Sequence, residues 1–184
     1  RFAYLAPTFK QAKSIAWDYM KQFTDKIPNT KFNETELRVD LPNGARITLL
    51  GSDSPDGLRG IYLDGCVIDE YANVNSRLFP EVIRPALSDR KGYCVFIGTP
   101  AGMNNNFYEL YQHANGAEDW FNYKAKASDT KIVDEDELVK AKEVMGEKKY
   151  NQEFECDWIA NIEGAVYGDI VGEMDDSNKL TRVP

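Results

Sequence analysis

Three short, continuous apolar runs constrain the fold of this chain more than any other feature of its sequence. They are Phe2–Ala6, Cys66–Ile68 and Tyr93–Ile97, and each is followed by turn-forming or acidic residues. Apolar runs of this length are typical of central parallel strands, because other layers cover such strands on both faces. Since helical patterns separate the runs, the sequence predicts an α/β fold with a mainly parallel sheet flanked by helices.

Periodic patterns between the first two runs predict a helix and a hairpin. Apolar residues at helical spacing predict an amphipathic helix with an apolar face made of Ala12, Ile15, Ala16, Tyr19, Met20 and Phe23. Two later stretches alternate apolar and polar residues, at Leu37 and Val39 and at Ile47 and Leu49. Asn43-Gly44 lies between these stretches and is a strong turn signal, so we expect a β-hairpin inserted into the fold.

The second half of the chain carries further helical patterns. Residues 107–113 have helical spacing, and residues 120–127 alternate like a strand. Asp134 with Glu137 resembles a capping box, which predicts a helix that Gly146 interrupts. Residues 150–154 then predict another helical stretch, and the acidic, glycine-spaced residues 161–184 are typical of a linker.

Composition limits the classes of function. The chain has 184 residues, of which 42% are hydrophobic, which is enough for one domain with a real core. It has no apolar run of 18 residues, so no membrane partner is expected. Its three cysteines lack CxxC spacing, which argues against a disulfide framework or a zinc site. The net charge of −8 argues against a stand-alone DNA-binding module, so any contact with DNA must be local or come from other segments.

The clearest sign of chemistry is the pair Asp69-Glu70, which directly follows the apolar run Cys66–Ile68. In nucleotide-hydrolysing folds, an aspartate at the end of a buried strand holds Mg²⁺. A neighbouring glutamate can polarise the attacking water. Ligands of parallel sheets bind at the carboxyl ends of the strands, where this pair is expected. The alternative is an ordinary strand end with two solvated acids.

Two other segments are weaker candidates. Gly98-Thr99-Pro100 ends the next apolar run, where a small residue and a hydroxyl could sense the γ-phosphate, although the same triplet is good turn chemistry. Arg59 lies in a loop flanked by Gly57 and Gly60, from which a guanidinium could reach a phosphate. The alternative for Arg59 is a local ion pair with Asp53, Asp56 or Asp64.

The order of these segments resembles that of bacteriophage large terminases, the DNA-packaging motors. The resemblance covers nearly the whole chain and is carried by the ordered set Tyr4–Thr8, Leu58–Gly60, Val67–Ala72, Gly98–Pro100, Asn106–Tyr108 and Gln152–Asp157. It implies an ATPase domain with a P-loop NTPase-like fold of the ASCE type, and ATP and Mg²⁺ as cofactors.

The resemblance also implies roles and partners. Asp69 matches the magnesium ligand and Glu70 the catalytic base. Thr99, with Gly98 and Pro100 beside it, matches the motif that couples hydrolysis to movement. Arg59 matches a loop arginine that acts on nucleotide, in its own subunit or in a neighbouring one. The implied partners are double-stranded viral DNA, the portal protein, the small terminase subunit and further copies in a homo-oligomeric ring, in the cytoplasm of the infected bacterium at the portal vertex of the procapsid.

One departure from the family pattern is large. No Gly-Lys pair occurs in the chain, so the phosphate-binding loop Gly-x-x-x-x-Gly-Lys-Ser/Thr is absent. In the family this loop precedes the strand that corresponds to Phe2–Ala6. We therefore expect residues 1–160 to be a partial ATPase domain truncated at its N-terminus, and residues 161–184 to lead toward a missing nuclease domain. The chain alone is then expected to be inactive.

Two other functions fit parts of the sequence. A DEAD-box-like helicase ATPase domain would share Ala6-Pro7-Thr8, Asp69-Glu70 and Gly98-Thr99-Pro100, but no second similar domain with an arginine-rich motif follows. A non-catalytic α/β scaffold would leave Asp69 and Glu70 merely solvated.

Overall fold

The computed structural model describes residues 1–159 of the chain. These residues form two compact units, the first comprising Arg1–Gly98 and the second beginning at Thr99. The predicted linker 161–184 lies outside the described residues. Within residues 1–159, no helix combines the length and the apolar character needed to cross a membrane.

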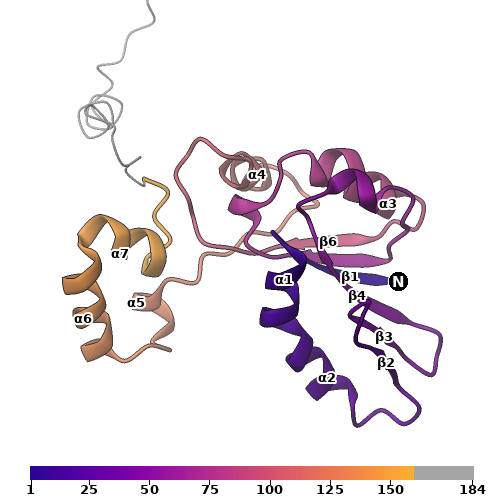
Figure 1. The fold of residues 1–184 in the computed structure, drawn as a ribbon. Helices are drawn as coiled ribbons and strands as arrows, with labels where there is room; N and C mark the ends of the chain where they lie inside the picture. Colours follow the sequence, from indigo (N-terminus) through magenta and orange to yellow (C-terminus); the bar gives the residue numbers. More distant parts are fainter. Residues whose placement is uncertain (160–184) are drawn as a thin grey trace, which may run out of the picture. The chain divides into compact units, whose positions relative to one another are not determined.

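The first unit is built on a six-stranded sheet with the strand order β2-β3-β4-β1-β5-β6 (Figure 1). The strands are β1 (Phe2–Ala6), β2 (Lys31–Asn33), β3 (Arg38–Asp40), β4 (Arg46–Gly51), β5 (Gly65–Ile68) and β6 (Tyr93–Phe96). Strands β4, β1, β5 and β6 run parallel to one another, and β3 runs antiparallel to both of its neighbours, β2 and β4. The predicted α/β fold with a mainly parallel sheet is confirmed, and the three apolar runs form the neighbouring strands β1, β5 and β6.

The predicted hairpin is formed by β3 and β4, with Val39 opposite Ile47. Gly44 has a positive φ of 82°, and the Asn43 side chain accepts a hydrogen bond of 3.0 Å from the backbone N–H of Ala45. This is the turn chemistry that the Asn-Gly pair predicts. Because β4 also runs parallel to β1, the hairpin widens the parallel sheet and is not a separate lobe. Strand β2, which the sequence patterns did not indicate, adds a third antiparallel strand.

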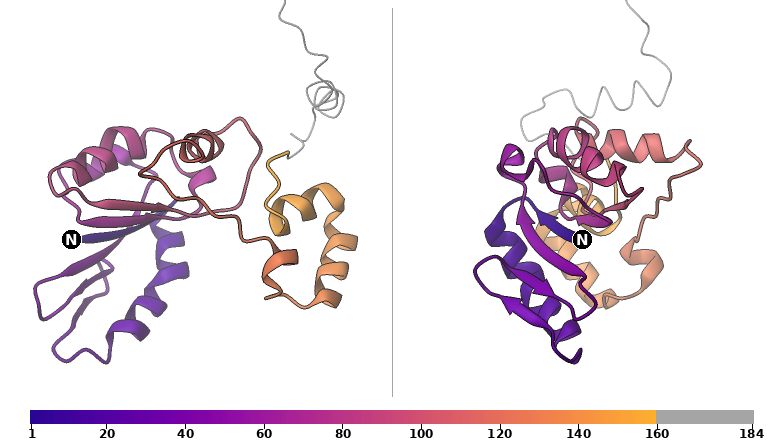
Figure 2. Two further views of the ribbon diagram at one scale, coloured as in Figure 1. Left: turned by 180° about the vertical axis from the view of Figure 1, so that it is seen from behind. Right: turned by 90° about the vertical axis from the view of Figure 1, so that its right-hand side faces the viewer.

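One face of the sheet is covered by a continuous helix made of α1 (Phe9–Ala12), the π-helical turn η1 (Lys13–Trp17) and α2 (Asp18–Thr24) (Figures 1 and 2). Thr8 caps its N-terminus by accepting a hydrogen bond of 3.2 Å from the backbone N–H of Gln11. The helix packs on a core of Ala6, Ala12, Trp17, Leu37, Val39 and Leu49.

The predicted apolar face of this helix is only partly correct. Ala12 is buried, and Ala16 and Met20 pack against the core, but Ile15, Tyr19 and Phe23 are exposed. A π turn takes one residue more than an α turn and so shifts the residues that follow it relative to a 3.6-residue repeat. The buried side of the helix is fixed by Trp17, whose indole N–H donates to Glu34 over 2.6 Å.

The opposite face of the sheet carries the segments that follow β4 and β5. They are the 3₁₀ turns η2 (Pro55–Leu58) and η3 (Tyr71–Asn73), the π-helical turn η4 (Phe79–Ile83) and α3 (Arg84–Ser88). The ring of Phe96 in β6 lies 4.7 Å from the ring of Tyr71 and 4.8 Å from that of Phe79. These contacts fix the turn after β5 over the sheet.

The second unit consists of helices, namely α4 (Asn106–Ala114), α5 (Ala127–Thr130), α6 (Glu135–Met145) and α7 (Glu147–Phe154). Asp134 caps α6, and α6 ends at Gly146, as predicted. The strand predicted over residues 120–127 is wrong, because residues 121–126 form no regular structure and α5 begins at Ala127. Alternation alone does not make a strand, since a strand also needs a neighbour to bond its backbone, and within residues 1–159 this segment pairs with none.

Candidate functional site

Asp69 and Glu70 lie where the sequence predicts them, at the carboxyl end of β5 in the middle of the parallel strands. The backbone N–H of Asp69 donates to the carbonyl of Leu5 over 2.8 Å and so extends the pairing with β1 by one residue. Glu70 then adopts a left-handed conformation, with φ 50° and ψ 43°, before the turn η3. For a residue other than glycine this conformation costs about 1 to 3 kcal/mol, and such strain is common at functional sites.

The carboxylate of Asp69 is held at both oxygens. Its Oδ1 accepts the backbone N–H of Glu70 over 2.8 Å, and its Oδ2 accepts a short hydrogen bond from the hydroxyl of Tyr4 in β1. Burial raises the pKa of the Tyr4 phenol, and the hydrogen bond to Asp69 raises this pKa further. Tyr4 therefore stays a neutral donor across the physiological range. The sequence did not reveal this role, because the contact depends on the register of β1 and β5.

Glu70 presents its carboxylate partly to solvent. Its Oε2 accepts a hydrogen bond of 3.3 Å from the side-chain amide of Asn73. A partly exposed carboxylate with one weak partner can accept a proton from a water molecule beside it, which is what a general base requires.

Gly98 is the part of the predicted Gly98-Thr99-Pro100 motif that the structure brings to the acidic pair. The carbonyl of Ile97 accepts the backbone N–H of Tyr71 over 3.0 Å, which ties the end of β6 to the turn after Glu70. A Cβ atom on Gly98 would lie only 3.1 Å from the nitrogen of Tyr71 and 3.3 Å from the Cα of Glu70. A side chain there would therefore push the two strand ends apart. Thr99 and Pro100 begin the second unit.

Arg59 is engaged in a network of charged side chains on the first unit. It follows η2, and its guanidinium contacts Asp56 at 2.8 Å and Glu81 at 3.2 Å. Arg77 shares Glu81 at 2.9 Å. The local ion pair that the sequence offered as an alternative is thus present with Asp56, and Glu81 and Arg77 were not foreseen. The side chain of Arg59 is still 52% exposed, so it remains accessible to another molecule.

The donor set suits magnesium better than a metal that needs a complete protein cage. Within residues 1–159, no group of three or more histidine, cysteine or acidic side chains is placed to hold an ion. Magnesium in nucleotide sites needs only one or two carboxylates, because phosphate oxygens and water complete its octahedron. Asp69, fixed by two hydrogen bonds at a strand end, fits that requirement.

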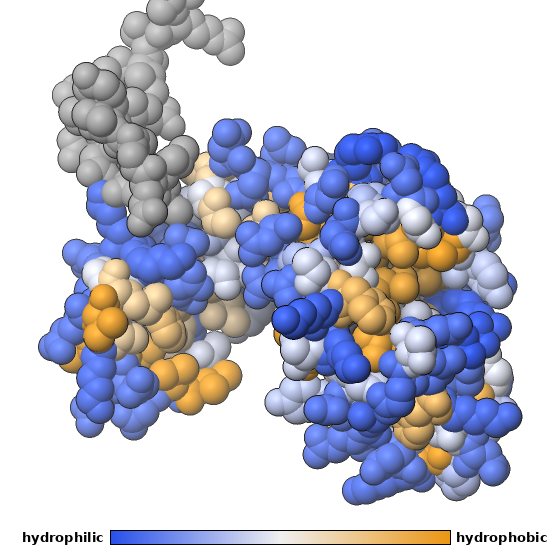
Figure 3. Space-filling model, viewed as in Figure 1, coloured by the Kyte–Doolittle hydropathy of each residue, from blue (hydrophilic) through white to orange (hydrophobic). Residues whose placement is uncertain are grey.

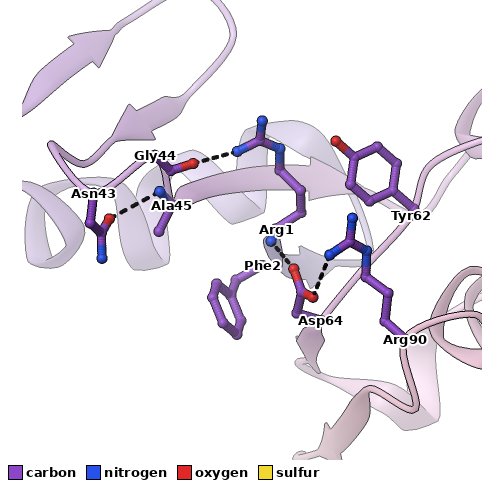
Figure 4. Close-up of a pocket in the computed structure, with 8 residues that line it drawn as sticks. All are labelled: Arg1, Phe2, Asn43, Gly44, Ala45, Tyr62, Asp64 and Arg90. Atoms are coloured by element: carbon purple, nitrogen blue, oxygen red, sulfur yellow. Dashed lines mark hydrogen bonds and ion pairs between the residues drawn. The ribbon is translucent and has the colours of Figure 1, made fainter.

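A pocket of about 550 Å³ lies at the other end of the same strands. Figure 4 shows its lining, in which the Arg1 side chain donates to the carbonyl of Gly44 over 2.7 Å and Arg90 contacts Asp64 at 3.2 Å. Phe2 and Asp64 place this pocket at the amino ends of β1 and β5. Ligands of parallel sheets bind at the carboxyl ends, so this pocket is not the candidate site.

The face of the sheet over β6 is incompletely covered. Hydrophobic residues gather on the surface between α1 and α3 (Figure 3). On β6 and just after it, Tyr93, Val95 and Ile97 are exposed, with Val95 at 42%. Strand β6 is also an edge of the described sheet. An exposed apolar edge strand commonly receives another strand or element.

Comparison with known proteins identifies relatives of the whole described region. Residues 1–169 match the family model for the N-terminal part of the terminase large subunit, T4likevirus-type. The large terminase subunits of Thermus phage G20c and Thermus virus P23-45 are each 30% identical to the chain over 126 residues. Those alignments cover 58% of the chain and 26% of each relative, so the chain spans about a quarter of their length.

Solved structures show the same fold. The ATPase domain of the Thermus phage P74-26 large terminase matches with a TM-score of 0.70 and 22% identity, covering 85% of this chain and 76% of that one. The large terminase of a second thermophilic bacteriophage matches with a TM-score of 0.70 and 15% identity, covering 85% of this chain and 40% of that one. These likenesses show a P-loop NTPase-like fold, and the family model, with the two relatives that are 30% identical, favours a terminase over a helicase. The chain belongs to the family of terminase large subunits, as part of their N-terminal region.

Proposed function

We propose that this chain is part of the ATP-hydrolysing motor of a phage large terminase, which translocates viral DNA into the procapsid. The observation that carries the proposal is the placement of Asp69 and Glu70 at the carboxyl end of β5, beside Gly98. Two carboxylates with different surroundings, one fixed by hydrogen bonds and one partly open to solvent, suit a metal ligand and a base.

Each residue has a distinct role in this proposal. Asp69 holds Mg²⁺ through water, and Glu70 takes the proton from the water that attacks the γ-phosphate. When bound there, Mg²⁺ would supply positive charge to neutralise the phosphate oxygens. Thr99 senses the γ-phosphate, and Gly98 and Pro100 shape the turn that carries it. Gly98 allows the strand end to approach the backbone of Glu70, which would transmit a change at the phosphate to the chain that follows β6.

ATP is the proposed nucleotide. Structures of the large terminase from that second thermophilic bacteriophage, in complex with ADP and with ATP-gamma-S, match the chain with TM-scores of 0.66 and 0.61. Their sequence identity to the chain is only 15% and 17%, so they support the choice of nucleotide through the shared fold. The missing Gly-Lys loop means that most phosphate contacts must come from a segment other than this chain.

The partners in this proposal are those of a packaging motor. They are double-stranded DNA, the portal protein, the small terminase subunit and further copies of the large subunit in a ring, in the host cytoplasm at the portal vertex. The complete large subunit would also cleave DNA with a separate nuclease domain. With a net charge of −8, any contact of this chain with DNA would be local, or would come from other segments.

The proposal is tested by Glu70→Gln in a full-length large subunit that contains this chain. The amide keeps the shape of the side chain and removes the base, so nucleotide binding should persist while ATP hydrolysis falls by roughly 10²–10⁴-fold. Asp69→Ala should also weaken magnesium-dependent nucleotide binding. Steady-state phosphate release and binding of a fluorescent nucleotide measure the two effects. Exposed Glu118→Gln is the matched control, and DNA packaging at the normal rate by Glu70→Gln would refute the assignment.

A further inference from the structure

We propose that Tyr4 is a positioning residue for magnesium binding, acting through the carboxylate of Asp69; this inference rests on the proposed role of Asp69. The hydroxyl of Tyr4 donates to Asp69 Oδ2 from the neighbouring strand β1. Tyr4 does not contact the metal in this arrangement. It fixes the orientation of the ligand.

The register of the sheet explains why Tyr4 reaches Asp69. Tyr4 pairs with Val67, and residues that lie directly opposite each other on neighbouring strands share one face of the sheet. Asp69 follows Val67 by two residues and points to that face as well, since side chains alternate along a strand. Two residues span about 6.6 Å, a distance that the ring of a tyrosine covers. A smaller donor, such as serine, at position 4 would not reach.

The two hydrogen bonds fix the carboxylate from both sides. Tyr4 holds one oxygen from β1, and the backbone N–H of Glu70 holds the other from the turn itself. Each carboxylate oxygen has a second lone pair, so both can still accept hydrogen bonds from magnesium-bound water. The N–H that Asp69 accepts belongs to Glu70, which is in the left-handed conformation. When Tyr4 fixes the Asp69 carboxylate, the carboxylate therefore also holds the turn that carries the proposed base.

The surroundings of Tyr4 allow the hydroxyl to be tested separately from the ring. The ring packs against the core cluster that includes Ala6 and Leu49. Tyr4→Phe keeps that packing and removes only the donor. Tyr93→Phe is the matched control, because Tyr93 lies in the same sheet but pairs with Gly65, at the far end of β5 from Asp69.

The experiment measures binding of Mn²⁺, as a spectroscopic substitute for Mg²⁺, to a full-length subunit that contains this chain, with ADP present. Electron paramagnetic resonance reports free Mn²⁺. We expect Tyr4→Phe to weaken Mn²⁺ binding by about 10-fold, at the lower end of the range for residues that support a metal ligand. The affinity for ADP without metal and the midpoint temperature of thermal unfolding should change little. A residue with only a structural role would lower both when it is substituted. Tyr93→Phe should match the unsubstituted protein.

Each other outcome contradicts the inference. If Tyr4→Phe binds Mn²⁺ as tightly as the unsubstituted protein, while Asp69→Ala does not, Tyr4 has no positioning role although the proposed function stands. If the unsubstituted protein shows no metal-dependent ADP binding, the proposed function fails and this inference fails with it. Should Tyr4→Phe not fold, Tyr4→Met, which also lacks the hydroxyl, provides the same comparison, and wild-type Mn²⁺ affinity in that variant would equally contradict the inference.

Discussion

At the scale of single residues, Arg59 lies in a network of exposed ion pairs. Its ion pairs with Asp56 and Glu81 are largely exposed, and solvent screens exposed pairs of this kind, so they hold the guanidinium only weakly. The pairs also lower the pKa of Asp56, with the hydrogen bond from Arg59 as the main cause. We propose that a nucleotide on a neighbouring subunit competes with these two carboxylates for the guanidinium, because arginine can contact two phosphate oxygens at once.

A role for Arg59 in a neighbouring active site predicts complementation between subunits. In a full-length large subunit, Arg59→Ala should lower ATP hydrolysis by roughly 10³–10⁵-fold, the range for an arginine supplied to another active site. Mixed with subunits that keep Arg59 but lack the lysine of the phosphate-binding loop, it should regain part of that activity. The ATPase rate of defined mixtures measures this. No recovery in rings shown to contain both subunits would place Arg59 in its own site or outside the chemistry.

At the scale of elements, α6 owes its start to a local signal. Asp134 accepts the backbone N–H of Asp136 over 2.9 Å, and three acidic residues follow in the first turn, where the helix dipole favours negative charge. None of its residues is fully buried, although Leu138, Ala141 and Met145 are half-buried, so packing stabilises it less than it does a core helix. The N-cap is therefore more important for the stability of α6 than it would be for a helix in the core.

Removing that cap should destabilise the second unit measurably. We expect Asp134→Ala to lower the free energy of unfolding by about 1 kcal/mol, the usual cost of losing a side-chain cap. Urea unfolding followed by helical circular dichroism measures the change. Glu135→Ala removes a charge from the same turn without removing the cap, so it should cost only a fraction of that amount. Equal losses in the two variants would show that charge alone stabilises this end of the helix.

At the scale of the whole molecule, the first unit presents an apolar edge strand. Tyr93, Val95 and Ile97 are exposed at β6, which ends the described sheet. Unpaired backbone groups beside apolar side chains favour pairing with another chain. The chain studied by itself should therefore self-associate through β6.

This expectation can be tested by measuring the self-association of charged variants. Val95→Lys places a charge on the exposed edge, a common means of preventing edge-to-edge pairing, and should shift the isolated chain toward monomer. Val144→Lys introduces the same charge on α6 at an exposed valine outside the sheet and should leave association unchanged. Analytical ultracentrifugation over a range of concentrations compares the two variants. Equal association of Val95→Lys and the unsubstituted chain would exclude β6 as the contact.

The sequence by itself determined the elements whose signals are local. Continuous apolar runs specified β1, β5 and β6, and the Asn43-Gly44 turn specified the hairpin, because each signal acts within a few residues. The acidic pair Asp69-Glu70 could be placed at a strand end for the same reason. Gly98 could be placed near it, since the ends of neighbouring parallel strands meet at one edge of a sheet.

Tertiary structure decided whatever depends on a distant partner. The exposed side of the first helix follows from the π turn and the burial of Trp17. Residues 121–126 alternate like a strand but pair with none of the described strands. Glu81 meets Arg59 only after folding. The contact between Tyr4 and Asp69 depends on the register of two strands that are 65 residues apart in sequence, and pattern alone does not specify such a register.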